Sequence, residues 1–312
     1  MRICSLVPGA TEVVVTLGLG EALVGISHEC DFPASIRHIP VMVQPVVDSD
    51  GADSAGIDRQ VKTLMSSGRP LYRVDEQALA KARPDIILTQ DVCDVCAVTP
   101  HALARAVQSL SPRPQLVTLA PHSLEDVIED VERIGTALGV ASRGITFAGS
   151  LRNRLAAIRN SSIRRSRPRI ACLEWLTPLY VGGHWVPEMV EAAGGVDVMG
   201  HRGQPSRQVT IDEVRAAAPD IIILMPCGFS LARTISELMA LCRNDRPWAR
   251  LLCSVSKTYG VDAGSYFSRP GPRLVDGVEL MAEICAGRLS SDRDSRSVRD
   301  LTESLYLTGH SH

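Results

Sequence analysis

The strongest constraint on the fold is a recurring short run of Ile, Val and Leu, bounded by Pro, Gly, Asp or Ser and followed by residues at helical spacing. Runs this apolar are typical of strands that are buried on both faces, and their alternation with helices predicts parallel α/β sheets. The chain contains two sets of four such runs. They are residues 2–6, 23–27, 85–89 and 115–119, and residues 169–174, 179–182, 220–225 and 254–259.

The two sets resemble each other, which predicts two similar lobes. VDEQALAKARPDIIL (residues 74–88) matches IDEVRAAAPDIIIL (residues 211–224) apart from a small gap. A weak internal repeat of this kind indicates a duplicated α/β unit, although the order helix, Pro-Asp, strand also recurs by chance.

The segment between the two sets predicts a long connecting helix. It has apolar residues at helical spacing, Ser123 as a candidate N-cap and acidic residues directly after it. The run SSDRDSRSVRD after residue 287 is too polar to bury much surface and predicts a mobile tail. We therefore expect an N-terminal lobe over 1–122, a connecting helix over 123–163, a C-terminal lobe over 164–287 and a mobile tail over 288–312.

Charge and cysteine content limit the classes of function. The 312 residues carry 33 basic and 35 acidic side chains, so a net charge of -2 gives no electrostatic case for nucleic acid or an anionic membrane. No stretch approaches the roughly 18 to 20 apolar residues of a membrane span. Nine irregularly spaced cysteines do not form the framework of a secreted disulfide-rich protein. The start MRICSLVPGATE reads as a strand and a helix, which predicts a cytoplasmic protein, or a periplasmic one whose signal peptide has been removed.

Soft ligands and aromatic side chains gather at the ends of the expected strands. Ligands bind beyond the carboxyl ends of the strands in open parallel sheets. Two of the three Trp and two of the four Phe follow such strands, which predicts a ligand cleft at these ends. The candidate ligand-binding residues are His28, Cys30, Phe32, Trp175, His184, Trp185, Tyr266, Phe267 and Arg269.

Several of these residues suit a large flat ligand that contains a metal. Trp175 and Trp185 offer faces for a corrin or porphyrin, with stacking worth on the order of 1 kcal/mol beyond area burial, or they pack between the lobes. His28 and His184 are candidates for an axial metal position, or are ordinary loop histidines. Arg269 either contacts a ligand phosphate or carboxylate, or lies at the start of the last helix in RPGPR.

The cysteine pair in TQDVCDVCAV leaves three interpretations open. Cys93 and Cys96, with Cys30 and His28 at a neighbouring strand end, form a candidate site for zinc, iron or an iron–sulfur cluster. A C-x-x-C pair also suits dithiol redox chemistry, although the thioredoxin-like context is absent. Small, partly buried residues without a role are the third interpretation. No G-x-S-x-G, phosphate loop or H-E-x-x-H motif is present, so binding is expected more than catalysis.

The chain also resembles a known family. RICSLVPGATEVVVTLGLGEALVGISHECDFP is similar to the opening of the periplasmic-binding-protein family that serves ABC importers of cobalamin and iron complexes, and ARPDIILTQ, PEMVEAAGG and YFSRPGPRLVDGVELMAEI continue the pattern. The resemblance implies an α/β fold of two Rossmann-like lobes joined by a long helix, with the ligand in the cleft between them. It implies docking on a transporter permease through surface glutamates, here Glu12 and Glu188. The alternative is that each carboxylate favours the dipole of a helical first turn.

Two functions follow from these patterns. In the first, the chain is a substrate-binding protein that binds a metal-containing tetrapyrrole-like ligand without a covalent bond. Cobalamin is the first candidate for this ligand, and an iron complex is the second. The alternative is a cytosolic metal–thiolate or iron–sulfur protein, an enzyme or a metallochaperone, that uses Cys30, Cys93 and Cys96.

Overall fold

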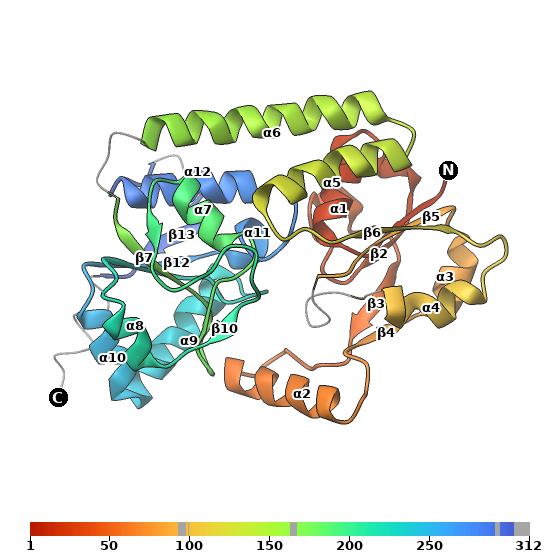
Figure 1. The fold of residues 1–312 in the computed structure, drawn as a ribbon. Coiled ribbons are helices and arrows are strands. Elements are labelled where there is room, and N and C mark those ends of the chain that lie inside the picture. The colour runs from red at the N-terminus through yellow and green to blue at the C-terminus, as the bar shows by residue number, and fades with distance from the viewer. Residues whose placement is uncertain (93–97, 99, 163–166, 291–293, 303–312) are drawn as a thin grey trace.

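Two α/β lobes lie side by side under a layer of helices (Figure 1). The computed structural model describes residues 1–92, 98, 100–162, 167–290 and 294–302. Between the lobes run α5 (Leu124–Ala137) and α6 (Ala141–Ser162), and α6 extends over both of them. This architecture confirms the expected fold class.

The first lobe is built on a six-stranded sheet in the order β4-β3-β2-β1-β5-β6. Its strands are parallel except for the antiparallel pair β3 and β4. The strands are β1 (Ile3–Ser5), β2 (Leu23–Ser27), β3 (Val41–Pro45), β4 (Tyr72–Val74), β5 (Ile86–Gln90) and β6 (Gln115–Leu119). The helices are α1 (Pro8–Thr16), α2 (Ser54–Ser66), α3 (Glu76–Ala82) and α4 (Pro100–Gln108), with 3-10 turns η1 (Gly20–Ala22) and η2 (Ala34–Ile36).

The second lobe has a seven-stranded sheet in the order β10-β8-β7-β11-β12-β13, with β9 also beside β7. The central strands β7, β11 and β12 are parallel, whereas β8, β10 and β13 run antiparallel to their neighbours. The strands are β7 (Arg169–Trp175), β8 (Tyr180–Val181), β9 (Val196–Asp197), β10 (Arg207–Gln208), β11 (Ile221–Leu224), β12 (Lys257–Val261) and β13 (Val298–Asp300). The helices are α7 (Val186–Ala192), α8 (Ile211–Ala216), α9 (Leu231–Asn244), α10 (Arg246–Cys253), α11 (Ala263–Tyr266) and α12 (Leu274–Cys285).

The end of the described chain differs from the expected mobile tail. β13 pairs antiparallel with β12, and Val298 and Leu301 are buried in the second lobe. The prediction of a mobile tail over 288–312 is therefore wrong for residues 294–302. The composition of the segment is polar on average, but two apolar side chains three positions apart suffice to dock a three-residue edge strand.

The connection between the lobes is a pair of helices in place of the single helix expected over 123–163. Ser123 caps α5 as predicted, because its hydroxyl accepts a hydrogen bond from the Asp126 backbone at 3.1 Å. The chain then turns through Gly139, whose φ of 74° lies in the left-handed region. Gly135 and Gly144 let α5 and α6 pack closely, since a Cβ on Gly135 would lie 2.9 Å from the Gly144 Cα.

One hydrophobic core runs through both lobes. It includes Val13 of α1, Val131 of α5, Leu151 of α6, Met189 of α7 and Met281 of α12. Two smaller clusters fill the opposite faces of the two sheets, one under α3 and α4 and the other under α8, α9 and α10. Because close-packed interiors resist shear, a large rotation of one lobe against the other would have to unpack this shared core.

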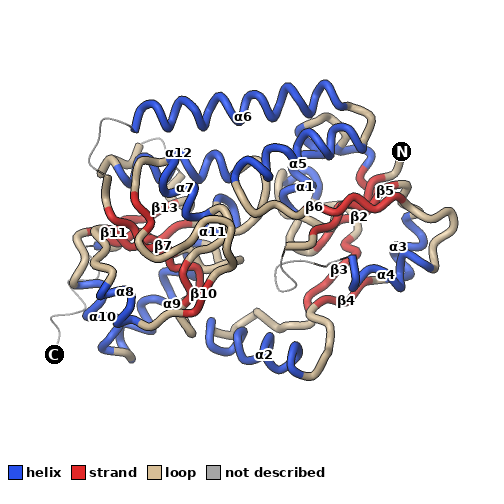
Figure 2. The backbone as a smooth tube through the Cα atoms, viewed as in Figure 1, coloured by secondary structure: helices blue, strands red, loops and turns tan. Residues whose placement is uncertain are grey.

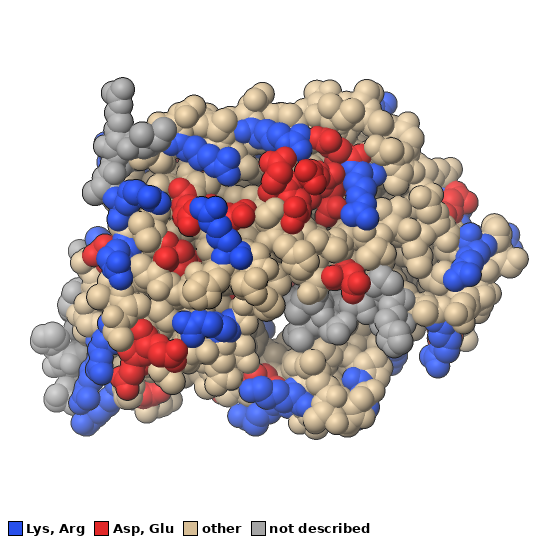
Figure 3. Space-filling model, viewed as in Figure 1, with Lys and Arg blue, Asp and Glu red and all other residues tan. Residues whose placement is uncertain are grey.

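Ion pairs on the surface hold α6 to its neighbours. Arg152 pairs with Glu125 and Glu132 of α5, and Arg154 pairs with Asp276 and Glu279 of α12. Figure 3 shows acidic side chains gathered over α5 beside basic ones along α6. In the part of the chain that the structure describes, no helix combines the length and apolar character needed to cross a bilayer.

Candidate functional site

The loops that follow the parallel strands meet between the lobes, and we call this region the interlobe junction. From the first lobe come the loops after β2 and β6, and from the second lobe come those after β7, β11 and β12. A small pocket opens at the carboxyl ends of β1, β2 and β3, where His28, Glu29 and Tyr72 are among the lining residues. This position is where ligands bind in open α/β sheets.

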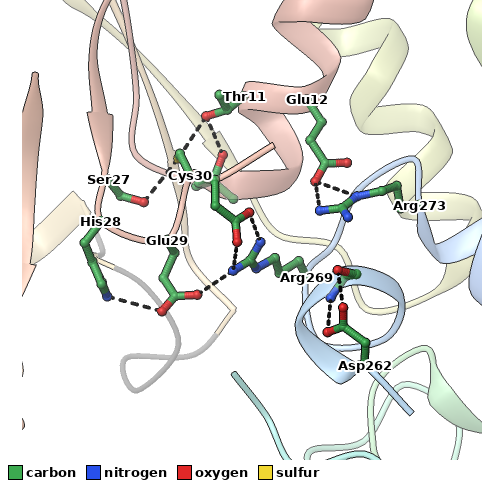
Figure 4. Close-up of polar contacts among 12 residues, drawn as sticks. Thr11, Glu12, Ser27, His28, Glu29, Cys30, Asp262, Arg269 and Arg273 are labelled. Carbon is green, nitrogen blue, oxygen red and sulfur yellow. Dashed lines mark hydrogen bonds and ion pairs between the residues drawn. The ribbon is translucent and has the colours of Figure 1, made fainter. Parts of the chain in front are cut away.

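Arg269 joins the two lobes through two carboxylates (Figure 4). Its guanidinium donates to Asp31 Oδ1 at 2.6 Å and to Glu29 Oε2 at 2.9 Å. Burial alone would raise the pKa of Glu29, but the hydrogen bond from His28 and the charge of Arg269 lower it to about 2. Both carboxylates thus belong to a charged network between the β2 loop and the segment after α11.

A second arginine, Arg273, pairs with Glu12 of α1 across the junction (Figure 4). Arg273 Nη2 donates to Glu12 Oε1 at 2.6 Å and Nε to the same oxygen at 3.0 Å. Burial raises the pKa of Glu12, and the hydrogen bonds and charge of Arg273 offset only part of that effect. The Arg273 guanidinium also lies 4.3 Å from the centroid of the Phe32 ring, which is a cation–π contact.

Backbone packing brings the lobes together beside this pair. A Cβ built on Gly9 would lie 1.8 Å from the carbonyl oxygen of Pro270, and one on Gly271 would lie 2.6 Å from the Gly9 Cα. Only glycine allows two backbones to approach this closely. The start of α1 and the segment before α12 are therefore in direct contact.

On the side away from α6, residues 46–71 reach from the first lobe to the second. We call this connection, which contains α2, the β3–β4 segment. Trp175 Nε1 donates to the Ser54 carbonyl at 3.2 Å, and the Ser54 amide donates to Glu237 Oε1 at 2.8 Å. Arg233 donates to the carbonyls of Ala52 and Ser49 at 2.8 and 3.1 Å.

A histidine pair lies where α5 begins. The rings of His122 and His184 have centroids 6.2 Å apart, and His184 also packs on Trp185 at 5.6 Å. Burial lowers the pKa of His184, and the nearby His122 lowers it further. Glu188 lies in the same region, since its carboxylate accepts a hydrogen bond from the Leu124 amide at 2.8 Å.

Four of the predicted ligand-binding residues lie at the junction, and each contacts a group of the opposite lobe. Trp175 and Arg269 make the hydrogen bonds described above, and Phe32 is 48% exposed under Arg273. His184 faces His122. His28 lies beside the pocket, with its ring 5.8 Å from that of Tyr72.

Trp185 and Phe267 are buried within the second lobe. Trp185 is 5% exposed and donates from Nε1 to the Phe267 carbonyl at 2.8 Å, and Phe267 itself is 2% exposed. Tyr266 is half-buried, with its ring 6.5 Å from that of Phe267. In this arrangement Trp185 and Phe267 support the lobe and do not offer a ring face to a ligand.

Cys30 points into the first lobe (Figure 4). It is 5% exposed, and its sulfur lies 3.1 Å from Thr11 Oγ1 and 3.3 Å from Ser27 Oγ. Burial raises the pKa of the Cys30 thiol, which opposes the thiolate form that binds metals. The described residues contain no group of three or more His, Cys, Asp or Glu placed to hold a metal ion. Cys93 and Cys96 lie outside the described residues.

The two predicted docking glutamates are not equivalent. Glu12 is 6% exposed and paired with Arg273, so the expectation of a surface carboxylate is wrong for this arrangement of the lobes. The helical pattern correctly placed Glu12 on α1 but gave no sign that the second lobe covers it. Glu188 is half-buried at the start of α7, and its role in docking stays a prediction.

Several junction residues were missed by sequence reasoning. The pairing of Glu12 with Arg273 joins positions 261 apart, and no local pattern reports such a contact. Phe229 and Arg233 carried a weak signal in the sequence, because they follow a strand end at helical spacing. In the structure, the Arg233 guanidinium lies 3.9 Å from the centroid of the Phe229 ring. The missed residues are Ser54, His122, Phe229, Arg233 and Glu237.

These features define a two-lobed α/β protein of the substrate-binding type, with its candidate site between the lobes. The model of the family described as periplasmic binding protein matches residues 3–241, and the chain belongs to this family.

Relatives in the family are distant but cover most of the chain. The vitamin B12-binding protein of Vibrio cholerae serotype O1 is 22% identical over 298 residues, which span 91% of this chain and 87% of the relative. Among solved structures, the periplasmic vitamin B12 binding protein BtuF of Vibrio cholerae has a TM-score of 0.64 at 20% identity, covering 91% of this chain and 96% of its own. A periplasmic heme binding protein from Pseudomonas aeruginosa has a TM-score of 0.69 at 16% identity, covering 96% and 97%. At these identities the likeness to the solved structures shows the fold.

Proposed function

We propose that this chain is the substrate-binding component of an ABC importer and that it holds a cobalt or iron tetrapyrrole at the interlobe junction. Cobalamin is the first candidate and heme the second, because similar proteins carry vitamin B12-binding and heme-binding names. The observation that carries the proposal is the meeting of loops from both sheets at one junction, with Trp175 and Phe32 among the residues there.

The ligand would lie between the loop of residues 28–32 and the second-lobe groups Trp175 and Arg269. These walls touch in the present arrangement, so a corrin-sized ligand separates Arg269 from Glu29 and Asp31. The freed guanidinium is then available to a carboxylate or phosphate of the ligand, which an arginine binds through paired hydrogen bonds. No observation among the described residues favours the metal–thiolate alternative.

Absorbance titration of the purified protein with cyanocobalamin and with hemin tests the proposal. One of the two is expected to bind with a change in its visible spectrum. Trp175→Ala and Phe32→Ala are expected to weaken that binding by about 2- to 10-fold each, the range for loss of one aromatic contact. Ile145→Ala, at a 58% exposed position on α6, is the control and leaves the affinity unchanged. Absence of binding for both ligands, or equal affinity in all variants, would contradict the proposal.

A further inference from the structure

The β3–β4 segment is weakly packed for its length. In residues 46–70 only Ser54 and Leu64 are buried, while Val46 and Met65 are 39% and 53% exposed. No described helix or strand packs extensively against α2. Figures 1 and 2 show α2 apart from the helices that cover the first sheet, on the side opposite α6. Segments with so few apolar contacts belong to the low-stability end of a structure.

Three side chains of the second lobe hold this segment in place. Arg233 and Glu237 lie one turn apart on α9, and Trp175 ends β7. Together they make four hydrogen bonds to the backbone of residues 49, 52 and 54. All four partners in the segment are backbone atoms, so the attachment is polar.

The attachment also leaves a polar atom unsatisfied. Ser54 is fully buried, yet its hydroxyl has no hydrogen-bond partner. A buried hydroxyl without a partner opposes the closed contact and is relieved when water reaches it.

The opposite side of the junction is built differently. There the backbones of Gly9 and Gly271 touch, Glu12 pairs with Arg273, and the shared core runs through α1 and α12. Moving the lobes apart on that side disrupts close packing. Among the residues that the structure describes, release of the β3–β4 segment breaks the four hydrogen bonds and exposes little apolar surface.

We propose that residues 46–71 form a lid that detaches from the second lobe while the two lobes stay packed, with Arg233, Glu237 and Trp175 as its latch. Release of the lid frees the Trp175 indole, which lies 5.3 Å from the Phe229 ring in an edge-on pair, for contact with an incoming ligand. The lid itself is a property of the unliganded chain, and only the identity of the ligand rests on the proposed function.

Hydrogen exchange of the unliganded protein, resolved by peptide mass spectrometry, tests the lid. The latch variant Arg233→Met with Glu237→Met removes three of the four hydrogen bonds, and Arg243→Met at an exposed position of the same helix is the matched control. We expect peptides that cover α2 to exchange about 10-fold faster or more in the latch variant, the loss expected for charged hydrogen bonds. Peptides from β3, β4 and α6 are expected to keep their protection, which also shows that the variant is folded.

Two results would overturn the lid. One is equal exchange of α2 in the latch variant and in Arg243→Met. The other is a joint loss of protection in α2, α1 and α12, which would mean that the lobes separate as a whole. Stopped-flow mixing with cyanocobalamin adds a second measurement, in which the latch variant is expected to associate faster than Arg243→Met. If cyanocobalamin binds to neither protein, cobalamin binding fails as the function, while the exchange experiment still decides the lid.

Discussion

Replacing Arg273 by Met is expected to lower the free energy of unfolding far more than replacing both Arg273 and its ion-pair partner Glu12. The side chains of Glu12 and Arg273 are 7% and 15% exposed, and the shortest distance between them is 2.6 Å. Removing one partner of a buried ion pair typically costs about 3–5 kcal/mol, because the other charge stays buried without compensation. Replacing both partners by uncharged groups of similar volume is often close to neutral.

The structure predicts an order among three variants. Arg273→Met leaves the Glu12 carboxylate buried and should lose about 3–5 kcal/mol of unfolding free energy at pH 8. Glu12→Gln leaves Arg273 with more exposure and with Phe32 as a neighbour, so a loss of about 1–3 kcal/mol is expected. The double variant Glu12→Gln, Arg273→Met should lie within about 1 kcal/mol of the unmodified protein.

The loss in Arg273→Met should depend on pH with a definite sign. Burial already raises the pKa of Glu12 with Arg273 present, and removal of the arginine raises it further. A carboxyl whose pKa is raised by folding destabilises the folded state above that pKa and has no effect below its unfolded value, about 4.5. The gap between Arg273→Met and the double variant should therefore shrink as the pH falls from 8 towards 4.5.

Urea unfolding followed by circular dichroism at pH 8 and pH 5 measures these differences, since a stability change moves the midpoint at constant slope. Small-angle scattering of each variant checks that the lobes have not separated. The reasoning is refuted if Arg273→Met is as stable as the double variant at pH 8. It is also refuted if their gap is the same at both pH values.

Three further predictions concern single residues. Burial raises the pKa of Asp130 to about 6, so Asp130→Asn should add up to about 3 kcal/mol of stability at pH 8 and nothing below pH about 4, as measured by urea unfolding. Gly9→Ala should cost at least about 1–3 kcal/mol in the same assay, because the new Cβ meets the Pro270 carbonyl oxygen. Leu301→Ala should cost about 2–5 kcal/mol and lower the melting temperature, because Leu301 is 1% exposed beside β13.

Each of these predictions has its own control. For Asp130→Asn the control is the same measurement at pH 4. A gain in stability that persists at this pH would contradict the raised pKa of Asp130 as its cause. Gly149→Ala is the matched control for Gly9→Ala, because no atom lies within 4 Å of its new Cβ. The control should gain about 0.5–1 kcal/mol of stability, since alanine favours a helix more than glycine does. For Leu301, a chain truncated after residue 293 that melts at the unchanged temperature would show that β13 adds no stability.

Strand prediction worked where burial on both faces leaves a simple signal. All four residues of β11, Ile221–Leu224, are buried, and the run is apolar throughout. The edge strands β10 and β13 are only two and three residues long, and each includes a charged side chain. They therefore carry no such pattern. Their place in the sheet depends on neighbours that are distant in the chain.

The sequence predicts a site at the strand ends, but it does not predict the direction of the side chains there. Cys30 follows the parallel strand β2, whereas Trp185 follows β8, which runs antiparallel to β7, and the rule on strand ends says nothing of the direction of either side chain. Trp185 turns into the second lobe to reach the Phe267 carbonyl, and Cys30 turns towards Thr11. Rotamers of this kind are set by packing partners, which a single sequence does not reveal.

The core that runs through α1, α5, α6, α7 and α12 belongs to neither half of the chain alone. Either half produced as a separate fragment would present its share, such as Val131 or Met281, to water, and an apolar surface of this kind promotes aggregation. Chimeric receptors that exchange one lobe for that of a relative would therefore need to transplant the helical layer together with it.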